Sequence, residues 1–393
     1  MKQGILTINA GSSSIKFALF PLDRPISPEA EVSGQIDGIG AETTKMVAKN
    51  KAGERIADQL LEGGKVSHAQ AFDALLKWFT ASHANWQIVA VGHRVVHGGE
   101  RYSKPTLIDD VVLGHLQSFI PLAPLHEPHN VAGIIALQAL LPSVPQIACF
   151  DTAFHRSQPE VAQTFGLPRQ ITAEGIKRYG FHGLSYEYIA RALPQHSGRA
   201  TGRVVVAHLG NGASMAAMVD RKCVATTLGF STIDGLMMGT RCGNLDPGVI
   251  LHLMETKNLS VKDMTRMLYK ESGLLGVSGL SQDMRTLLAS DKPEAAEAVN
   301  LFCYRIAREL GSLAAAAGGL DALVFTGGIG EHAAEVRRRV CLQSEWLGIR
   351  LNPEANARHE LRISAGNSSV DVLVIPTNEE WMMAHHAQTL LGL

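Results

Sequence analysis

Two stretches of the chain share one pattern of apolar and small polar residues. Residues 5–20 read ILTINAGSSSIKFALF, an apolar run that breaks into a glycine-serine loop and resumes as an alternating strand. From residue 204 the sequence VVVAHLGNGASMAAMV repeats this pattern, with its loop at 210–214. Apolar runs of this length that flank a short loop of small residues predict β-hairpins. The sequence therefore predicts two similar β-hairpins.

Strand-like and helix-like segments alternate elsewhere. The sequences QIVAVGH at 87, PQIACFD at 145, ALVFTGG at 322 and VDVLVIPT at 370 predict strands, and VAGIIALQALL and EAAEAVNLFCYRIARELGSLAAAA predict helices. This alternation is typical of an α/β fold. It also places four groups of residues just beyond the carboxyl ends of strands, where open α/β sheets bind ligands: Gly92–Arg94, Asp151, Gly327–Gly328 and Thr377.

The length of 393 residues favours two domains over one core. No linker marks a boundary, but the second hairpin pattern starts about fifty residues after position 150. We therefore expect an N-terminal domain at 1–150 and a C-terminal domain at 151–379, with a final helix at about 380–393 that completes the first domain.

Composition narrows the class of protein. The chain has 36 Lys and Arg against 37 Asp and Glu, a net charge of −1, so it has no broad basic field for nucleic acid or anionic membrane. Its five cysteines are scattered without a C-x-x-C pair, which suits a reducing compartment and offers no zinc spacing. With neither a signal peptide nor a continuous membrane-spanning run, we expect a cytoplasmic protein.

Two other clusters invite functional readings that we do not favour. We expect the basic run 337–339 late in a helix, where its side chains are solvated and suit the negative end of the helix dipole. Arg337→Ala should therefore leave kcat/KM almost unchanged. His126 and His129 could suggest zinc, but prolines at 124 and 128 indicate a turn before a helix, and no third ligand is evident.

Three loops of small residues are candidates for phosphate binding. These are NAGSSS, LGNGAS and TGGIGEH, in which the backbone N–H groups can approach phosphate oxygens closely. None matches a P-loop or a dinucleotide-binding G-x-G-x-x-G motif. A tight turn explains any one loop alone, whereas the ordered set indicates a phosphate-handling duplication.

A series of ordered blocks along essentially the whole chain resembles the acetate kinase family. The blocks are NAGSSSIKF, VGHRVVHGGE, PLAPLH, FDTAFH, RYGFHGLS, HLGNGAS, DGLMMGTR, DPG, SGLLGVSG, DMR, FTGGIGE and PTNEE. The resemblance implies two duplicated ribonuclease-H-like domains of the actin, sugar kinase and heat-shock ATPase superfold, which flank a nucleotide cleft. In that superfold each domain begins with a hairpin, as both stretches above predict.

The resemblance also implies an activity: reversible, Mg²⁺-dependent transfer of the γ-phosphoryl group of ATP to acetate, giving acetyl phosphate and ADP. Mn²⁺ is a possible substitute. Arg94 and Arg241 would clamp the phosphoryl and carboxylate groups, and His182 would donate a hydrogen bond to the transferred group. Asp151 matches an acidic residue of the family. Since acetate is already ionised at neutral pH, it needs no general base, and we favour an orienting role for Asp151.

Further site residues follow from the same resemblance. Asn9 and Glu379 are the expected magnesium ligands. If Thr377 is the N-cap of the last helix, Glu380 is the capping-box acid and Glu379 is left for the metal. The expected nucleotide contacts are Ser12, Ser14, Lys16, His208, Leu209, Gly210, Asn211, Gly212, Asp283, Met284, Arg285, Gly328, Ile329, Gly330, Glu331 and His332.

The expected acyl site comprises Arg94, Val96, Leu125, Phe181 and Thr232. Two positions depart from the family pattern, because His332 stands where asparagine is frequent and Thr232 where proline is common. A propionate kinase with the same mechanism is the nearest alternative, although Val96 favours acetate over a larger acyl group. Nucleotide-driven interaction proteins and sugar kinases are weaker alternatives. Members of the family commonly form homodimers.

Overall fold

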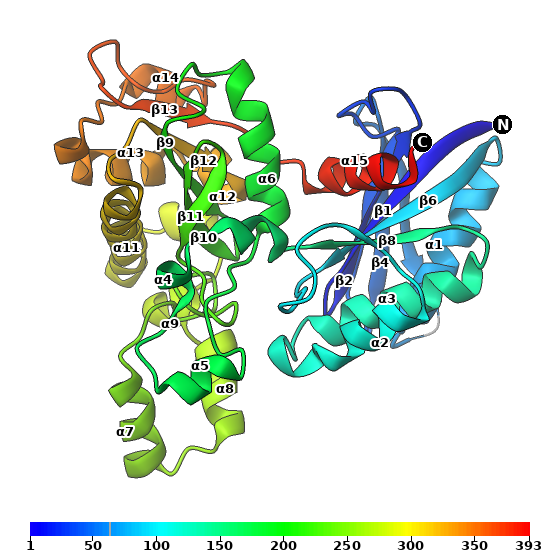
Figure 1. Ribbon diagram of the computed structural model, residues 1–393, viewed down its shortest axis with the longest axis horizontal. Coiled ribbons are helices and arrows are strands. Elements are labelled where there is room, and N and C mark those ends of the chain that lie inside the picture. The colour runs from blue at the N-terminus through cyan, green and yellow to red at the C-terminus, as the bar shows by residue number, and fades with distance from the viewer. Residues whose placement is uncertain (63) are drawn as a thin grey trace. The chain divides into compact units, whose positions relative to one another are not determined.

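The computed structural model, which describes residues 1–62 and 64–393, contains two β-sheets, each in its own unit (Figure 1). Unit 1 comprises Met1–Ala153 and Asn378–Leu393, and unit 2 comprises Phe154–Thr377. Relative to the expected boundaries, residues 151–153 and 378–379 belong to unit 1. None of the helices in the described ranges is long and apolar enough to cross a membrane.

Unit 1 is built on an eight-stranded sheet in the order β5-β4-β3-β2-β1-β6-β8-β7. The five strands from β5 to β1 form an antiparallel meander, whereas β1, β6 and β8 run parallel. Its strands are β1 (Lys2–Ala10), β2 (Ser14–Pro21), β3 (Val32–Asp37), β4 (Thr44–Asn50), β5 (Arg55–Leu61), β6 (Trp86–Val95), β7 (Thr106–Leu107) and β8 (Gln146–Phe150). Its helices are α1 (His68–Ser82), α2 (Asp110–Ser118), α3 (Glu127–Leu140) and α15 (Glu379–Leu391).

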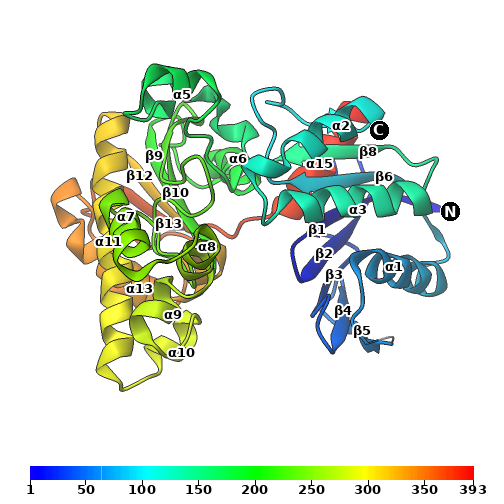
Figure 2. The ribbon, with the colours of Figure 1, turned by 90° about the horizontal axis from the view of Figure 1, so that it is seen from below.

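Helices cover both faces of this sheet. Val91 of β6 belongs to a buried cluster with Phe72 of α1 and Leu137 of α3. The next residue, Gly92, points to the other face, where a Cβ atom would lie 3.1 Å from the carbonyl oxygen of Met383 in α15. Figures 1 and 2 show α15, from the opposite end of the chain, lying beside β1 and β6. The C-terminal helix is thus part of unit 1.

Unit 2 has a five-stranded sheet in the order β11-β10-β9-β12-β13. The strands are β9 (Arg203–Leu209), β10 (Ala213–Val219), β11 (Lys222–Thr226), β12 (Ala322–Thr326) and β13 (Asp371–Val374). The helices are α4 (Glu160–Gln163), α5 (Arg169–Ala173), α6 (Gly183–Ala192), α7 (Pro247–Lys257), α8 (Val261–Lys270), α9 (Gly273–Ser278), α10 (Met284–Leu288), α11 (Pro293–Ala317), α12 (Gly327–His332), α13 (Ala334–Gln343) and α14 (Pro353–Ala357).

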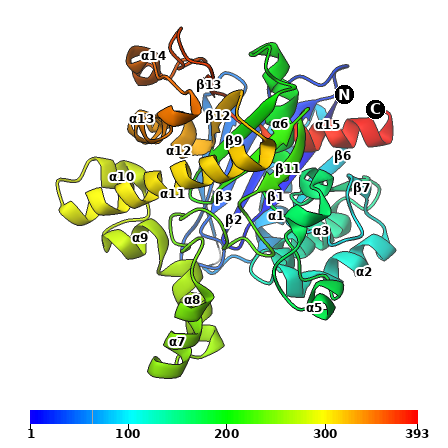
Figure 3. The same ribbon diagram turned by 60° about the vertical axis from the view of Figure 1, so that its left-hand side comes forward.

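Two helices of unit 2 have clear sequence reasons for their position. Residues Tyr186 and Ile189 of α6 pack with Val204 and Val206 of β9 in one buried cluster. The long helix α11 begins with a proline at its first turn, ends at Gly318 with φ 75°, and packs against β9, β10 and β11 (Figure 3). β9 carries a continuous apolar run at 204–207, and because successive side chains point to opposite faces of a strand, both of its faces can be buried.

The two sheets share one topology. In unit 1 the strands β3-β2-β1-β6-β8 are joined by two antiparallel and then two parallel pairings, and β11-β10-β9-β12-β13 repeats this order and pairing in unit 2. The predicted hairpins are β1–β2 and β9–β10, at equivalent places in the two sheets. The α/β class and the repeated hairpin are therefore confirmed.

One strand end differs from the expectation. Gly92–Arg94 lies inside β6, which continues to Val95, and not beyond its end. Asp151 follows β8 directly, and Gly327 follows β12 directly. The sequence misplaces the end of β6 because this strand is buried on both faces near its end. A parallel strand that is covered on both sides can carry polar residues without ending there.

Candidate active site

Arg94, Asp151 and Asn9 form a hydrogen-bonded cluster in unit 1. Arg94 Nε lies 3.1 Å from each carboxylate oxygen of Asp151, and Nη2 lies 2.5 Å from Oδ2. Arg94 Nη1 donates to Asn9 Oδ1 at 3.2 Å. Burial opposes the charged guanidinium, but the adjacent Asp151 carboxylate outweighs it and holds the pKa of Arg94 above its usual range. Arg94 therefore stays a cation.

The cluster leaves part of Arg94 available for a ligand. A guanidinium has five N–H groups, and here Nε uses its one while Nη1 and Nη2 each use one of two. One N–H remains on each terminal nitrogen. The side chain is 21% exposed, whereas that of Asp151 is 1% exposed. The fixed, partly exposed guanidinium can thus bind an anion through two N–H groups.

Glu379 is the first residue of α15, and its helix cap differs from the expected capping box. The N-cap is Asn378, whose side chain accepts a hydrogen bond from the Trp381 N–H at 2.9 Å. The expectation that Thr377 caps the helix and Glu380 completes a capping box is wrong. Asparagine is at least as good an N-cap as threonine, and it stands one residue closer to the first helical turn.

The electrostatics of Glu379 link it to the Arg94 cluster. Burial raises the pKa of the Glu379 carboxyl, as do the nearby carboxylates of Asp151 and Glu380, whereas Arg94 and Lys16 lower it. Five charged groups of unit 1 therefore lie close enough to influence one another. Lys16 is exposed on β2, opposite Asn9 in the hairpin register.

The donors in this cluster fit a hard cation such as Mg²⁺. Carboxylate and amide oxygens are its preferred protein ligands, and Mg²⁺ typically takes only one or two carboxylates and fills its other positions with water and phosphate. Among the described residues no group of three or more His, Cys, Asp and Glu side chains is arranged to hold a metal. Such a sparse ligand set is compatible with a metal that arrives together with a nucleotide.

The loop of the first hairpin lies next to this cluster in the sequence. Its turn is closed by the Gly11 N–H, which donates to the Ser14 carbonyl at 2.8 Å. Ser12 is exposed at the tip, and Ser14 is half-buried at the start of β2. The loop thus presents small residues to solvent, as a phosphate-binding turn requires.

The first turn of α3 holds the segment that contains Val96. Asn130 Oδ1 accepts from the Val96 N–H at 2.9 Å, while its Nδ2 donates to the Ala10 carbonyl at 2.8 Å. Glu127 Oε2 accepts from the His97 N–H at 3.2 Å. Val96 is buried and Leu125 is half-buried. The sequence analysis did not identify Glu127 and Asn130, although Glu127 directly follows the PLAPLH block and Asn130 lies three residues after it.

In unit 2, His182 and Arg241 approach the same glycine. A Cβ atom on Gly212 would lie 3.4 Å from His182 Nε2 and 3.9 Å from Arg241 Nη1. His182 precedes α6 in a left-handed conformation with φ 58°, and its ring stacks on His208 at 4.5 Å. The loop between β9 and β10 therefore lies against two expected phosphoryl ligands.

The segment around Arg241 is fixed by backbone contacts. Arg241 Nη1 donates to the Thr232 carbonyl at 3.0 Å, so two predicted site residues are directly joined. The Gly239 N–H donates to the Asn211 carbonyl at 3.0 Å, and a Cβ on Gly239 would lie 2.0 Å from Asn211 Oδ1. Only glycine allows this close approach. Phe181, next to His182, is buried.

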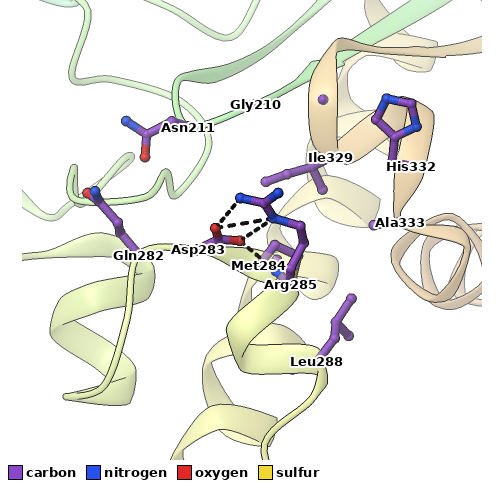
Figure 4. A pocket seen from close by; sticks show the side chains of 11 residues that line it. Gly210, Asn211, Gln282, Asp283, Met284, Arg285, Leu288, Ile329, His332 and Ala333 are labelled. Atoms are coloured by element: carbon purple, nitrogen blue, oxygen red, sulfur yellow. Dashed lines mark hydrogen bonds and ion pairs between the residues drawn. The ribbon is translucent and has the colours of Figure 1, made fainter. Parts of the chain in front are cut away.

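A cavity of about 430 Å³ lies near the second hairpin loop (Figure 4). Of the predicted nucleotide residues, it is lined by Gly210, Asn211, Asp283, Met284, Arg285, Gly328, Ile329 and His332. Gln282, Leu288 and Ala333 also line it. Sequence reasoning missed these three, which flank the DMR and GGIGEH blocks and could have been included on that basis.

Asp283 and Arg285 form an ion pair in this cavity. Arg285 Nη2 donates to Asp283 Oδ2 at 2.6 Å, and the pair lies between Asn211 and Ile329 in Figure 4. Asp283 also caps α10 by accepting from the Arg285 N–H at 2.8 Å. Hydrogen bonding from the Arg285 side chain lowers the pKa of Asp283 to about 2. Asp283 thus orients the arginine that lines the cavity.

Glu331 points into the protein. Its Oε1 accepts from the Gly327 N–H at 2.8 Å and from the Thr377 N–H at 3.4 Å. This carboxylate therefore ties the start of α12 to the segment that follows β13. Gly330, in α12, and Leu209, at the end of β9, are both buried.

Arg337 corrects the expectation of a solvated helix end. It is the fourth residue of α13 and is fully buried at 0% exposure. Nη1 donates to the Gly330 and Glu331 carbonyls at 2.8 Å, and Nε donates to Asn356 Oδ1 at 2.8 Å. Burial lowers the pKa of Arg337 to about 10. A basic run says nothing about which of its members faces the core, and here α13 turns Arg337 inward.

Comparisons with known proteins give one family. The acetokinase family model matches residues 4–385. An acetate kinase of Rhodopseudomonas palustris is 55% identical over 99% of both chains. A propionate kinase structure from Francisella tularensis subsp. tularensis SCHU S4 has a TM-score of 0.90 at 37% identity, covering 98% of this chain and 99% of that one.

The acetate kinase structure from Porphyromonas gingivalis has a TM-score of 0.89 at 36% identity, covering 99% of this chain and all of that one. These likenesses confirm the expected family and its duplicated actin-like fold. Because the family model and the relatives match nearly the whole length, the chain belongs to the acetokinase family.

Proposed function

We propose that the protein is a phosphotransferase that moves the γ-phosphoryl group of ATP to acetate, reversibly, giving acetyl phosphate and ADP. The observation that carries this proposal is the 55% identity, over essentially the full length, to an acetate kinase. The geometry of the two arginine-containing clusters supports it and indicates how each residue contributes.

In unit 1, Arg94 is the proposed anion clamp. Asp151 and Asn9 fix its guanidinium and leave two N–H groups for oxygen atoms of the acceptor or the phosphoryl group. A pre-oriented cation needs no reorganisation when charge spreads over the transferred group, and this is the main source of catalysis in phosphoryl transfer.

In unit 2, His182 and Arg241 are the proposed donors to the transferred phosphoryl group. Both approach Gly212, at the loop of small residues between β9 and β10. The 430 Å³ cavity that adjoins this loop is the proposed nucleotide site, with Asp283 orienting Arg285. Three predicted nucleotide residues that do not line this cavity would support the residues that do: Gly330, Glu331 and Leu209.

Asp151 is proposed to act through Arg94 and not as a base. A carboxylic acid acceptor has a pKa of about 4 to 5 and is ionised at neutral pH, so no proton has to be removed from it. The fully buried Asp151 already contacts Arg94 through both of its oxygens. Its proposed work is to hold the charge and the orientation of Arg94.

Mg²⁺ is the proposed metal, with Mn²⁺ as an alternative. Asn9 and Glu379 would hold it from unit 1, and the bound ion would offset charge on the phosphates of the nucleotide. Lys16, Ser12 and Ser14, on the neighbouring hairpin, are proposed phosphate contacts. The raised pKa of Glu379 agrees with a site that gains a cation, because a cation stabilises the ionised carboxylate.

Propionate is the second candidate acceptor. A solved structure with 37% identity and a TM-score of 0.90 is a propionate kinase. Val96, Leu125, Phe181 and Thr232 are the proposed acyl contacts, and one methylene in such a pocket is worth only about 1–3 kcal/mol. We propose acetate as the better substrate because Val96 restricts the space that a longer chain needs.

The test is a substrate panel with hydroxylamine trapping of acyl phosphates. ATP and Mg²⁺ are supplied with acetate, propionate or butyrate, and the hydroxamate is measured. We expect the highest kcat/KM for acetate and a lower value for propionate. No hydroxamate with any of the three acids would reject the proposal in favour of a nucleotide-dependent interaction protein.

We also propose, from the family resemblance, that the protein forms a homodimer. Sedimentation velocity at micromolar concentration tests this. A sedimentation coefficient that matches a 42.2 kDa particle across the concentration series would reject the dimer.

A further inference from the structure

His68, the first residue of α1, is hydrogen-bonded to the loop of the first hairpin. Its Nε2 lies 2.7 Å from the carbonyl oxygen of Gly11. A carbonyl oxygen can only accept, so Nε2 carries the hydrogen of this bond and donates it. The bond joins segments that lie 57 residues apart, and the sequence analysis did not identify His68 as a candidate site residue.

His68 is held in place by the protein itself. A capping box fixes the start of α1, because the Ser67 side chain accepts from the Gln70 N–H and the Gln70 side chain accepts from the Ser67 N–H. Phe72, in the next turn, is buried in the core of unit 1. The His68 ring also stacks on that of His129 in α3, with 5.1 Å between the ring centroids. The N–H donor is therefore directed at the loop before any nucleotide binds.

Two consecutive carbonyl groups of the loop are held from the same side of the sheet. Asn130 Nδ2, in α3, donates to the Ala10 carbonyl at 2.8 Å, and His68, in α1, donates to the next carbonyl, that of Gly11. Helices α1 and α3 pack into one buried cluster on this side. In a trans peptide the C=O of one residue and the N–H of the next point in opposite directions. The Ser12 N–H is therefore directed away from His68.

The opposite face of the sheet carries Arg94 and its partners. Ala10 belongs to the buried cluster beneath α1 and α3, so its neighbour Asn9 points to the other face, where its side chain meets Arg94. Lys16 stands opposite Asn9 in the hairpin and shares this face. Ser12 is exposed at the loop tip, and within the described residues its N–H has no hydrogen-bond acceptor. This N–H can therefore donate to an anion that binds beside Arg94 and Lys16.

The bond from His68 selects one of two orientations of the Gly11–Ser12 peptide. Gly11 has no Cβ atom, so rotation of this peptide meets little steric resistance. A rotated peptide would turn its carbonyl oxygen, with a partial negative charge, toward a bound phosphate and would turn its N–H away. Donors that are already oriented need no reorganisation when an anion binds. The His68 donor thus stabilises the orientation that suits an anion.

We propose that His68 is a positioning residue for nucleotide binding, which donates to the Gly11 carbonyl and thereby keeps the Ser12 N–H directed at the phosphates of ATP. His68 acts through the loop and not by contact with the nucleotide. This inference rests on the proposed function, which places phosphates at the first hairpin loop. The hydrogen bond belongs to the protein without ligand and can be measured separately.

The first part of the test separates the N–H donor from the ring. His68→Phe keeps a flat ring that can stack on His129 but has no N–H, whereas His68→Gln loses the ring and keeps an amide donor. We expect His68→Phe to weaken the binding of Mg²⁺-ATP about 10-fold, because a hydrogen bond to a charged phosphate is lost. His68→Gln should bind within about 3-fold of the wild type. Isothermal titration calorimetry without an acceptor is the measurement.

A second histidine of unit 1 provides the matched control. His115 Nδ1 lies 2.7 Å from Tyr102 Oη, so His115→Phe also removes a hydrogen bond of a half-buried histidine but does not touch the loop. We expect His115→Phe to bind Mg²⁺-ATP as the wild type does. The KM for acetate should stay within about 2-fold of the wild type in the variants of both histidines, because the change is confined to phosphate binding.

NMR observes the peptide itself. The sequence has two Gly–Ser pairs, Gly11–Ser12 and Gly311–Ser312, so cell-free synthesis with ¹³C′-glycine and ¹⁵N-serine gives two peaks that each correlate an amide with the preceding carbonyl. Ser312→Ala removes one peak and assigns the other. In His68→Phe we expect the Gly11 ¹³C′ resonance to move upfield, because its carbonyl loses a donor. Mg²⁺-ATP should move the Ser12 amide proton downfield in the wild type and in His68→Gln, and much less in His68→Phe.

Three results would overturn the proposal. An unchanged Gly11 ¹³C′ shift in His68→Phe would show that the hydrogen bond is absent in solution. A shifted carbonyl with wild-type affinity for Mg²⁺-ATP would show that the orientation of the peptide does not affect binding. Equal weakening in His68→Gln and His68→Phe would show that the ring matters and not the N–H donor.

A failure of the proposed function would look different. If binding of Mg²⁺-ATP depends on His68 as expected but no carboxylic acid yields an acyl phosphate, the proposed function is rejected and the positioning role of His68 stands. If His68→Phe does not fold, His68→Leu, which also lacks a donor, takes its place in both measurements.

Discussion

Asp151 holds Arg94 through both of its carboxylate oxygens, with the Arg94 Nε at 3.1 Å from each and Nη2 at 2.5 Å from one. The acid follows β8 and the arginine lies within β6, so two adjacent parallel strands bring the pair together. Both ionic groups are in place before any ligand binds. The cost of orienting the guanidinium is therefore met during folding and not during catalysis.

Loss of Asp151 should act through Arg94. We expect Asp151→Asn and Arg94→Ala each to reduce kcat/KM by at least about 100-fold, and the double variant to be little worse than Arg94→Ala, because residues that act as one unit are not additive. Steady-state kinetics with acetate and ATP provide the measurement. Arg55→Ala is the control, since it breaks the exposed pair with Asp58 in the same unit. If the double variant lost the full sum of the two single-variant effects on kcat/KM, Asp151 and Arg94 would act independently, and the prediction would be wrong.

Arg337 should matter for stability, contrary to the solvated role expected from sequence. Arg337→Ala leaves the buried carbonyls of Gly330 and Glu331 without their donor, which should cost about 3 kcal/mol or more and lower the melting temperature. Since these carbonyls belong to α12, KM for ATP should also rise. Thermal unfolding measures the loss of stability, and steady-state kinetics at varied ATP concentration measures the KM. Arg338→Ala, which disrupts an exposed pair with Glu335, should melt close to the wild type.

Glu127 should make stability fall as pH rises. Burial raises the pKa of Glu127 from 4.5 to about 8, and the nearby Asp151 adds to this although the His97 N–H opposes it. Between these two pH values the folded protein keeps a proton that the unfolded chain releases, so the free energy of unfolding decreases with rising pH.

Glu127→Gln removes that titration. The stability of the variant relative to the wild type should increase by on the order of 3 kcal/mol between pH 5 and pH 8. Calorimetric melting over this range is the measurement. The exposed acid Glu42 provides the control as Glu42→Gln, with a side chain 84% exposed. Parallel curves for the wild type and Glu127→Gln would show that the carboxyl is ionised throughout.

Val96 should set the limit on acyl length. Val96→Ala removes buried methyl groups from a segment whose backbone is fixed by Asn130, so the space should remain and admit a longer chain. We expect the ratio of kcat/KM for propionate to that for acetate to rise about 5- to 50-fold. Val112→Ala, at a buried valine of α2 in the same unit, should leave the ratio unchanged. An unaltered ratio in Val96→Ala would place the acyl group elsewhere.

The sequence alone determined the α/β class, the two hairpins, the duplicated plan and the family. These depend on local patterns, because apolar periodicity and glycine-rich loops act over a few residues, and on a long series of ordered blocks. The same blocks also identified four candidate site residues: Arg94, Asp151, His182 and Arg241.

Only the tertiary structure decided which side chains contact one another. Arg337 became a buried anchor because α13 turns one member of a basic run inward, and Asn378 replaced Thr377 as the N-cap because the chain enters α15 one residue later than expected. Ser214 Oγ is hydrogen-bonded to Tyr186 Oη and to His182 Nδ1, and these bonds join β10 to the start of α6 across 28 and 32 residues. Such contacts depend on packing between distant segments, and no local pattern of apolar and polar residues encodes them.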